Sequence, residues 1–386
     1  MGVTAAKGFV ASGVACGIKP SGDPDLALVA TADGRPVPAA GVFTANKATA
    51  APVLVSGDHL AASGGQAAAV VLNSGNANAC TGGPGRANAE RMTALVAGEL
   101  GCDQAHVLVC STGLIGIPLP MSAVERGIPT LTAALSPDGA TAAEAIRTTD
   151  TVRKEVAVDA GAFTVGGMAK GAAMLAPSLA TMLAVLTTDA VADADVLGDV
   201  LAAGVESSFN ALLVDGATST NDTVLLLASG ASGARDDDAL AAAVATACAG
   251  LARAMAADAE GATKLVEVRV TGAVSESDAR RAAKAVAGSI LCKCSWYGCD
   301  PYWGRVVSEL GSSGAAFDPD TVSVAYGDVT VCRSGVAAPH DALALQETMA
   351  AGELLVAADL GLGSGSASVL TCDLTHGYVD ENKGTS

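Results

Sequence analysis

The sequence predicts a mixed α/β protein in which short strands and longer helices follow one another along the whole chain. Half of the 386 residues are hydrophobic and only 16% are charged, which is enough apolar surface for one large core or two adjoining ones. Aromatic residues make up only 3% of the chain, so Ala, Val and Leu must build that core. The 45 glycines allow backbones to approach closely, which favours tightly packed layers of sheets and helices.

Two apolar runs that end in polar turns predict buried strands in the first third of the chain. Residues 67–72 lead into the polar turn 73–78, and residues 106–110 lead into the polar turn 111–113. Functional side chains are often found on such turns because a rigid strand positions them. Both turns are therefore candidate positions for functional groups.

The second half of the chain carries separate signals for helices and strands. The Ala-dominated segment 238–258 predicts a helix, and the alternation of Val with charged residues over 266–270 predicts a half-buried strand. Ser275, with a carboxylate three residues later, predicts the start of another helix. The pair Gly327-Asp328 lies between two short apolar runs, which is typical of a hairpin.

The charge balance argues against several classes of partner. A formal net charge of −18 at pH 7 would repel nucleic acid and anionic lipid over most of the surface. Residues 1–19 lack the charged start and continuous apolar core of a secretion signal. The weakly polar stretch 171–188 is near membrane-spanning length, but it contains Pro177 and several hydroxyl side chains. We therefore expect a cytoplasmic protein that binds neither nucleic acid nor membranes.

The cysteines predict reduced thiols rather than a disulfide framework or a metal site. The chain has ten Cys and no Cys-x-x-Cys spacing, which is typical of a cytoplasmic protein. Cys292, Cys294 and Cys299 come closest to a metal cluster. Because apolar residues flank them, we interpret these three as small buried thiols.

Common catalytic motifs are missing from the sequence, but one segment is informative. The chain has no G-x-S-x-G elbow, phosphate-binding loop or H-E-x-x-H motif, and the spacing of its four His does not support a triad. Segment 170–190, with Ala180-Thr181 at its centre, resembles the self-processing segment of the ornithine acetyltransferase family. Further matches in the same order extend this resemblance over essentially the whole chain, at 73–78, 111–116, 148–151, 208–210, 214–222, 258–264, 300–305 and 372–379.

The resemblance implies a fold and a processing event. The expected fold is α/β, a layered αββα-like sandwich with a second, smaller C-terminal subdomain. Cleavage between Ala180 and Thr181 would give an α chain, 1–180, and a β chain, 181–386, with the subdomain beginning at about residue 236. The two chains should stay associated because strands of both share one core, and the family suggests an α2β2 assembly.

Cleavage at Ala180-Thr181 has a simple chemical basis. A Thr hydroxyl held against the preceding carbonyl can attack it, and water can hydrolyse the resulting ester. The α-amine exposed on Thr181, with a reference pKa of roughly 7.7 to 8.0, can then accept the proton of its own hydroxyl. One residue thus supplies both the nucleophile and the base. An Ala-Thr pair alone is more often an ordinary structural dipeptide. Here the surrounding matches to the family favour cleavage at this pair.

The resemblance also assigns the remaining site residues. Thr112 and Gly113 match the family's oxyanion hole, one through its hydroxyl and one through its backbone N–H, although the tripeptide alone would read as a turn. A Lys can pair with an amino-acid carboxylate and a Glu with an amino group, while a structural ion pair is the ordinary alternative for both. The implied substrate contacts are Thr148, Lys170, Thr181, Glu260, Asn382 and Ser386.

The implied reaction moves an acetyl group from N2-acetyl-L-ornithine to L-glutamate by a ping-pong mechanism, as a step of arginine biosynthesis. It requires no metal or bound cofactor, and acetyl-CoA is a possible second donor. Tyr302, Ala217 and the tail ending in Thr385 and Ser386 depart from the family pattern, so substrate identity stays open. The alternatives are the same chemistry on another ornithine-like amine, an N-terminal-nucleophile amidase or aminopeptidase, and a ligand-binding protein.

Overall fold

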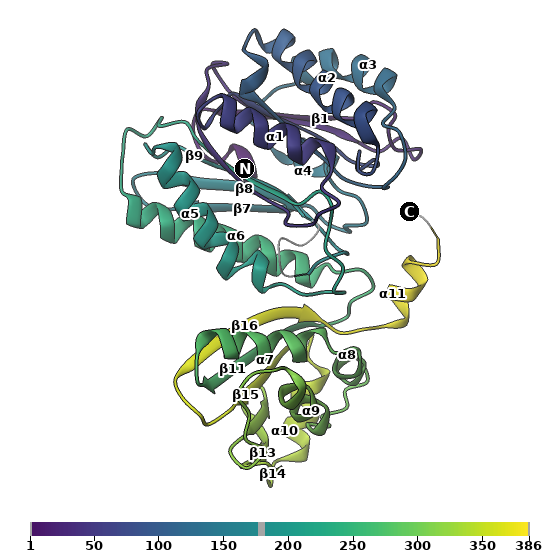
Figure 1. Cartoon of the computed structure of the whole chain (residues 1–386), viewed down its shortest axis with the longest axis vertical. Coiled ribbons are helices and arrows are strands. Elements are labelled where there is room, and N and C mark those ends of the chain that lie inside the picture. The colour runs from purple at the N-terminus through teal and green to yellow at the C-terminus, as the bar shows by residue number, and fades with distance from the viewer. Residues whose placement is uncertain (1, 177–181, 385–386) are drawn as a thin grey trace. The chain divides into compact units, whose positions relative to one another are not determined.

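The computed structural model describes residues 2–176 and 182–384, which form two compact units (Figure 1). The N-terminal unit contains residues up to 210 together with 217–255. The C-terminal unit contains 211–216 and 256–384. The helix that follows the polar loop at 230–238 therefore belongs to the N-terminal unit.

The first sheet of the N-terminal unit has four strands in the order β1 (Phe9–Val14), β2 (Leu26–Thr31), β5 (Ala69–Asn73) and β6 (Val107–Ser111). Strands β5 and β6 are parallel, whereas β2 pairs antiparallel with both of its neighbours. Strands β5 and β6 confirm the two strands predicted before polar turns. Because β5 and β6 run in the same direction, the polar turns that follow them meet at one edge of the sheet.

The second sheet has six strands in the order β4 (Gln66–Ala67), β3 (Val37–Phe43), β10 (Thr223–Ala228), β9 (Leu183–Thr188), β8 (Thr164–Lys170) and β7 (Lys154–Asp159). Strands β9 and β10 are parallel and the other pairs are antiparallel. Both parallel strands are fully buried, which explains why their sequences are continuous apolar runs rather than alternating ones.

Alternate residues of the central strands supply two different cores. In β2, Ala27 and Val29 pack between the two sheets, while Leu26 and Leu28 pack against the helices outside. Three helices contribute to the outer core of the first sheet: α1 (Ala51–Ala62), α2 (Gly82–Leu100) and α3 (Met121–Ala133). Two helices cover the second sheet: α5 (Ala194–Ser207) and α6 (Asp237–Ala257). The N-terminal unit is thus the predicted αββα sandwich (Figure 1).

Short elements complete the N-terminal unit. Helix α4 (Ala140–Ala145) contributes to the core between the sheets. The 3-10 turn η1 (Gly2–Thr4) packs against β7 and β8, η2 (Gln104–His106) directly precedes β6, and η3 (Phe209–Ala211) follows α5.

The predicted Ala-rich helix is α6, whose length and composition among the described residues would suffice to cross a membrane. Half of its most apolar window is buried. Cys248 and Val244 of α6 approach α5 closely at Gly204, where an added Cβ would lie 3.4 Å from both side chains. This burial is typical of a core helix in a layered α/β protein.

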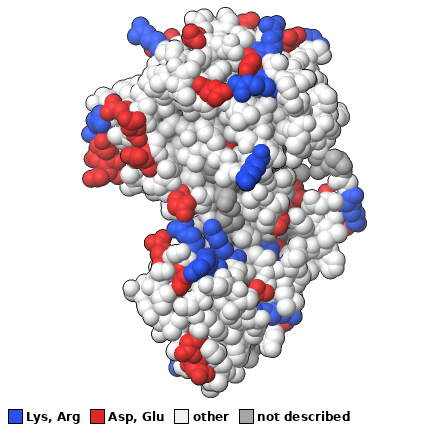
Figure 2. All heavy atoms as spheres, in the orientation of Figure 1, with Lys and Arg blue, Asp and Glu red and all other residues white. Residues whose placement is uncertain are grey.

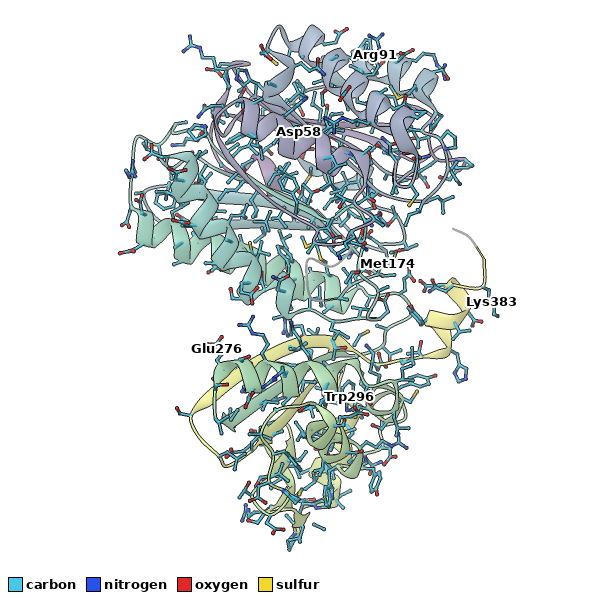
Figure 3. All side chains as sticks on the ribbon, in the orientation of Figure 1. Asp58, Arg91, Met174, Glu276, Trp296 and Lys383 are labelled. Atoms are coloured by element: carbon cyan, nitrogen blue, oxygen red, sulfur yellow. The ribbon has the colours of Figure 1, made fainter. Side chains whose placement is uncertain are left out.

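The C-terminal unit is a single sheet covered by helices. Its strand order is β14 (Val336–Ala337), β13 (Val329–Arg333), β12 (Ser323–Tyr326), β15 (Glu353–Asp359), β11 (Leu265–Ala273) and β16 (Gly365–Cys372). Its helices are α7 (Glu276–Gly288), α8 (Ile290–Tyr297), α9 (Gly304–Ser312), α10 (Ala342–Ala350) and α11 (His376–Glu381). The fully buried Trp296 of α8 packs in this core, and Figure 3 shows it among the helices of this unit.

Three local predictions for this unit are confirmed. Strand β11 buries its valines and turns Glu267 and Arg269 to the opposite face. Ser275 accepts a hydrogen bond from the N–H of Asp278 at 3.1 Å and so caps α7. Strands β12 and β13 pair antiparallel around Gly327, whose φ of 55° suits a tight hairpin.

The interpretation of three cysteines as buried thiols is wrong for two of them. All ten Cys are free, and Cys292 is buried, but Cys294 and Cys299 are exposed. Helix α8 places Cys292 and Trp296 on its inner face, whereas Cys294 lies on the face that carries the exposed Ile290. Apolar residues that flank a cysteine in the sequence therefore do not show that the cysteine lies on the buried face of its helix.

Figure 2 shows that acidic and basic side chains gather in separate small groups on one face, and that uncharged residues make up most of this face.

Candidate active site

Six of the predicted site residues lie in one or the other of the two units, and three lie outside the described part of the chain. Thr112, Gly113, Thr148 and Lys170 lie in the N-terminal unit. Glu260 and Asn382 lie in the C-terminal unit. Ala180, Thr181 and Ser386 lie outside the described residues, so the cleavage site, the nucleophile and the terminal contact stay predictions.

The predicted oxyanion turn follows β6 and is fixed by hydrogen bonds from two other segments. Ser111 Oγ donates to Asn73 Oδ1 at 2.6 Å, and the N–H of Thr112 donates to the carbonyl of Asn73 at 2.9 Å. Asn221 Nδ2 donates to the carbonyl of Ser111 at 2.9 Å. Movement of the turn would break these bonds and leave buried polar groups without partners, which is costly. The turn is therefore held in place.

Gly113 occupies a position that no other residue could fill without rearrangement. Its φ is 128°, and an added Cβ would lie 2.3 Å from the carbonyl carbon of Gly75 and 2.5 Å from the nitrogen of Asn76. The glycine is exposed, whereas the neighbouring Thr112 is only 3% exposed. The backbone can therefore come close to a bound acyl group at this point.

Lys170, the last residue of β8, is brought to the oxyanion turn by the second sheet. Its Nζ lies 3.3 Å from Thr112 Oγ1, and only 3% of the residue is exposed. The next residue, Gly171, has a φ of 156° and starts the loop that contains Met174, labelled in Figure 3. The predicted oxyanion hydroxyl and the predicted substrate-binding ammonium are thus direct neighbours.

Asp150, which the sequence analysis did not single out, contacts the backbone at Thr148 and directly after Lys170. Its carboxylate accepts hydrogen bonds from Lys154 Nζ at 2.6 Å, from the N–H of Gly171 at 2.7 Å and from the N–H of Thr148 at 3.1 Å. Burial alone would raise its pKa, but the charges of Lys170 and Lys154 and the bonds from Lys154 and Gly171 outweigh it and lower the pKa to about 2. Asp150 is therefore a buried carboxylate that is charged at neutral pH.

Asp222, directly before β10, is a second carboxyl that the sequence did not reveal. Its Oδ1 accepts the N–H of Met182 at 2.9 Å, and the residue is fully buried. Oδ2 has no hydrogen-bond partner within the described part of the chain. Burial raises the pKa of Asp222 well above its ordinary value, against the lowering effects of the Met182 N–H, the Ser219 hydroxyl and Lys170. The pKa of Asp222 is therefore shifted in the opposite direction to that of Asp150.

In the C-terminal unit the structure brings Glu260 and Asn382 together. Asn382 Nδ2 donates to Glu260 Oε2 at 2.7 Å, and Glu260 is 8% exposed. Gly261, with a φ of 63°, lets α11 pack against this turn, because an added Cβ would lie 2.2 Å from the nitrogen of Tyr378. This contact fixes the carboxylate of Glu260 beside the end of α11.

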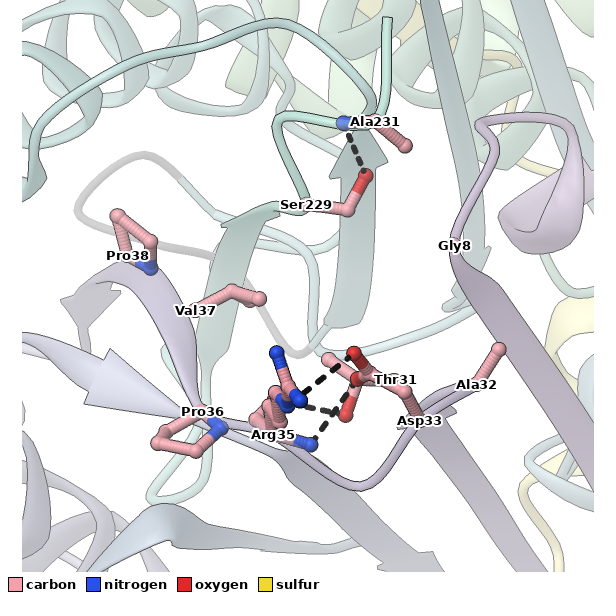
Figure 4. A pocket seen from close by; sticks show the side chains of 10 residues that line it. All are labelled: Gly8, Thr31, Ala32, Asp33, Arg35, Pro36, Val37, Pro38, Ser229 and Ala231. Atoms are coloured by element: carbon pink, nitrogen blue, oxygen red, sulfur yellow. Dashed lines mark hydrogen bonds and ion pairs between the residues drawn. The ribbon is translucent and has the colours of Figure 1, made fainter.

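A cavity of about 460 Å³ lies away from Thr112 and Asp222, at the other end of the N-terminal unit's strands (Figure 4). It is lined by Thr31 at the end of β2 and by Ser229, which follows the end of β10, whereas Asp222 precedes the start of β10. Its charged lining residues, Asp33 and Arg35, pair with each other on an exposed turn. None of the predicted site residues that the structure describes lines this cavity, so we do not place the chemistry there despite its size.

Comparisons with known proteins agree with the resemblance in the sequence. The model of the ArgJ family matches residues 10–384. The arginine biosynthesis bifunctional protein ArgJ of Streptomyces avermitilis is 48% identical, with 100% of both chains covered. The protein of the same name from Mycolicibacterium paratuberculosis is also 48% identical, and the match covers 100% of this chain and 96% of that protein.

Two solved structures were also matched. The ornithine acetyltransferase of Mycobacterium tuberculosis complexed with ornithine is 47% identical over 46% of this chain and 95% of that chain, with a TM-score of 0.44. The arginine biosynthesis bifunctional protein argJ of Bacillus halodurans is 35% identical over 51% of this chain and 95% of that chain, with a TM-score of 0.49. From the family match over residues 10–384 and the relatives that share nearly half of its residues over the full length, this chain belongs to the ArgJ family.

Proposed function

We propose that this protein is a glutamate N-acetyltransferase that moves the acetyl group of N2-acetyl-L-ornithine to L-glutamate through an acyl intermediate on Thr181. The observation that carries the proposal is the contact between Lys170 and Thr112, at 3.3 Å, in a member of the ArgJ family. It places a charged donor and a hydroxyl side by side at the end of a parallel strand pair, beside the exposed backbone of Gly113.

The proposed reaction starts with self-cleavage. The hydroxyl of Thr181 attacks the carbonyl of Ala180, the peptide nitrogen leaves as the α-amine of Thr181, and water hydrolyses the ester. The products are chains 1–180 and 181–386. Strands β8 and β9 lie on either side of this bond in sequence and pair antiparallel, so the two chains would remain joined through one sheet.

Acetyl transfer then takes place in two steps. Thr181 Oγ attacks the acetyl carbonyl while the α-amine takes its proton, and the Thr112 hydroxyl and Gly113 N–H donate to the developing oxyanion. The amine of ornithine leaves with a proton, and the amine of glutamate attacks the acyl-threonine in the second step. In this proposal Glu260 meets an amino group of the substrate, with Asn382 holding its carboxylate in place.

The same proposal covers the cofactors, assembly and location. Thr181 and the two oxyanion donors supply all the groups that acyl transfer requires, so no metal or bound cofactor is needed. Acetyl-CoA could acylate the same hydroxyl as a second donor. We further propose an α2β2 assembly in the cytoplasm, as the family resemblance implies.

Intact-protein mass spectrometry tests the proposal directly. The wild-type protein should give two fragments split before Thr181, with acetyl mass on 181–386 alone after incubation with N2-acetyl-L-ornithine. Thr181→Ala should remain one unlabelled chain, whereas Thr181→Ser, which keeps the hydroxyl and the amine, should still cleave.

Addition of L-glutamate should then remove the acetyl mass and yield N-acetylglutamate. Release of free acetate without transfer would instead indicate an amidase. Transfer to a different amine in a panel of acceptors would indicate specialised metabolism.

A further inference from the structure

We propose that Asp150 is a positioning residue for this reaction, which holds Lys170 against Thr112 and thereby directs the Thr112 hydroxyl at the acyl oxygen. The inference rests on the proposed function, because it assigns Thr112 the part of an oxyanion donor. Asp150 itself does not touch the substrate in this proposal.

Asp150 connects the backbone of two segments that carry candidate site residues. One carboxylate oxygen accepts the N–H of Gly171, directly after Lys170, at 2.7 Å, and the other accepts the N–H of Thr148 at 3.1 Å. Asp150 is 3% exposed, so these bonds are shielded from water. Loss of this carboxylate would release the turn at Gly171 and the start of the 148–151 segment together.

The charge of Asp150 also acts on the ammonium of Lys170. Lys170 is as deeply buried as Asp150, and an ammonium in such surroundings requires a nearby opposite charge to stay protonated. Lys154 forms a further ion pair with Asp150 at 2.6 Å, and both of those side chains are completely buried. The buried carboxylate of Asp150 thus interacts with the charges of two buried ammonium groups, those of Lys154 and Lys170.

The protonation state of Lys170 decides what the Thr112 hydroxyl can do. An ammonium group can only donate hydrogen bonds, so Thr112 Oγ1 must accept from Lys170 across the 3.3 Å contact. The hydroxyl proton of Thr112 must then point elsewhere and is available to an oxyanion. A neutral amine could instead accept that proton, and the hydroxyl would be lost as an oxyanion donor.

A double-mutant cycle tests whether Asp150 acts through Thr112. We would measure kcat and KM for acetyl transfer in wild type, Asp150→Asn, Thr112→Val and the double variant, each normalised to its cleaved fraction. Thr112→Val and Asp150→Asn should each lower kcat by about 100-fold, with KM changed less than about threefold. The double variant should fall no more than about threefold below Thr112→Val, because both changes remove the same donor.

A matched control separates this role from general loss of packing. Asp189 is another buried carboxylate of the same unit, at the far end of β9, and it accepts the N–H of Thr164 at 2.7 Å and of Lys7 at 3.1 Å. Asp189→Asn should leave kcat within about twofold of wild type even if it lowers stability. If Asp150→Asn does not fold, a variant with both Asp150→Asn and Lys154→Met replaces it in the double-mutant cycle. This variant removes both charges of the buried ion pair together.

The outcomes are distinct. The inference would be overturned if Asp150→Asn kept the wild-type kcat. It would also be overturned if Asp150→Asn lowered kcat by the same factor in the wild-type and the Thr112→Val background. Both results would leave the proposed function intact. Failure of both Asp150 variants to fold would assign the residue a purely structural part and would also overturn it. Absence of acetyl transfer by the wild-type protein would contradict the proposed function itself.

Discussion

The regions around Asp150 and Asp222 differ in how they compensate a buried carboxyl. Both residues are buried in the N-terminal unit, and the charge of Lys170 acts on both. Asp150 has two ammonium groups and two backbone N–H donors around it, and its pKa is lowered to about 2. Asp222 has the N–H of Met182 and an Oδ2 without a described partner, and its pKa is raised.

The contrast shows that burial alone does not determine the charge of a side chain. Desolvation raises the pKa of both carboxyls, and the number and charge of the partners decide whether that effect prevails. One side of the candidate site therefore has a fixed negative charge that can hold Lys170. The other has a carboxyl with a raised pKa beside Met182, the residue that follows the proposed nucleophile.

The largest expected effect is the loss of stability in Asp150→Asn. This change removes one side of the ion pair between Asp150 and Lys154, whose side chains are both completely buried. Breaking a buried ion pair from one side should lower the free energy of unfolding by about 3–5 kcal/mol. Denaturant unfolding of the variant and of Asp222→Asn would measure this, and equal losses in both would remove the distinction between the two regions.

Acidification should have the next largest effect, and it should act through Asp150. A carboxyl with a lowered folded-state pKa contributes stability that is fully present above its ordinary pKa of 3.8 and is lost as pH falls toward about 2. The difference between these values corresponds to about 2 kcal/mol. Urea unfolding between pH 5 and pH 2 should show wild type converging on Asp150→Asn by that amount. A gap that does not narrow would contradict the low pKa.

Local sequence patterns were sufficient to predict much of the fold. The strand before Ser111, the cap at Ser275 and the hairpin at Gly327 follow from periodicity and turn chemistry within a few residues. The layered arrangement came from the family resemblance and not from these patterns. Cys294 was misjudged because its exposure depends on the helical face it shares with Ile290.

The candidate site could be predicted only in part. Thr112 and Lys170 were both chosen from matched motifs, but their 3.3 Å contact joins strands of different sheets and has no signature in the sequence. Asp150 and Asp222 lie within matched motifs as well, yet the opposite shifts of their pKa values depend on distant groups such as Lys170 and Met182. The one local signal was a carboxyl directly before the buried strand β10.

A smaller effect is expected from the C-terminal unit, where a carboxylate has a neutral partner. Asn382→Ala removes the 2.7 Å hydrogen bond to Glu260, and a net hydrogen bond contributes about 1 kcal/mol. The KM for the amine substrate should therefore rise by roughly fivefold, with kcat nearly unchanged. Lys383→Ala is the matched control, because Lys383, labelled in Figure 3, pairs with Asp380 on the surface. Identical KM values for the two variants would show that Asn382 does not position Glu260.

The smallest effect at low pH should come from Asp222→Asn, and its pH dependence is the sharpest test of the comparison. The amide keeps the acceptor for the Met182 N–H, so unfolding free energies should differ by less than about 1 kcal/mol at pH 4. A carboxyl with a raised folded-state pKa contributes stability that is fully present below its unfolded pKa and is lost as pH rises toward the folded value. Wild type should therefore lose stability relative to Asp222→Asn as pH rises above about 4, the reverse of the trend for Asp150. A difference that stays constant as pH rises would contradict the raised pKa of Asp222 and would remove the contrast with Asp150.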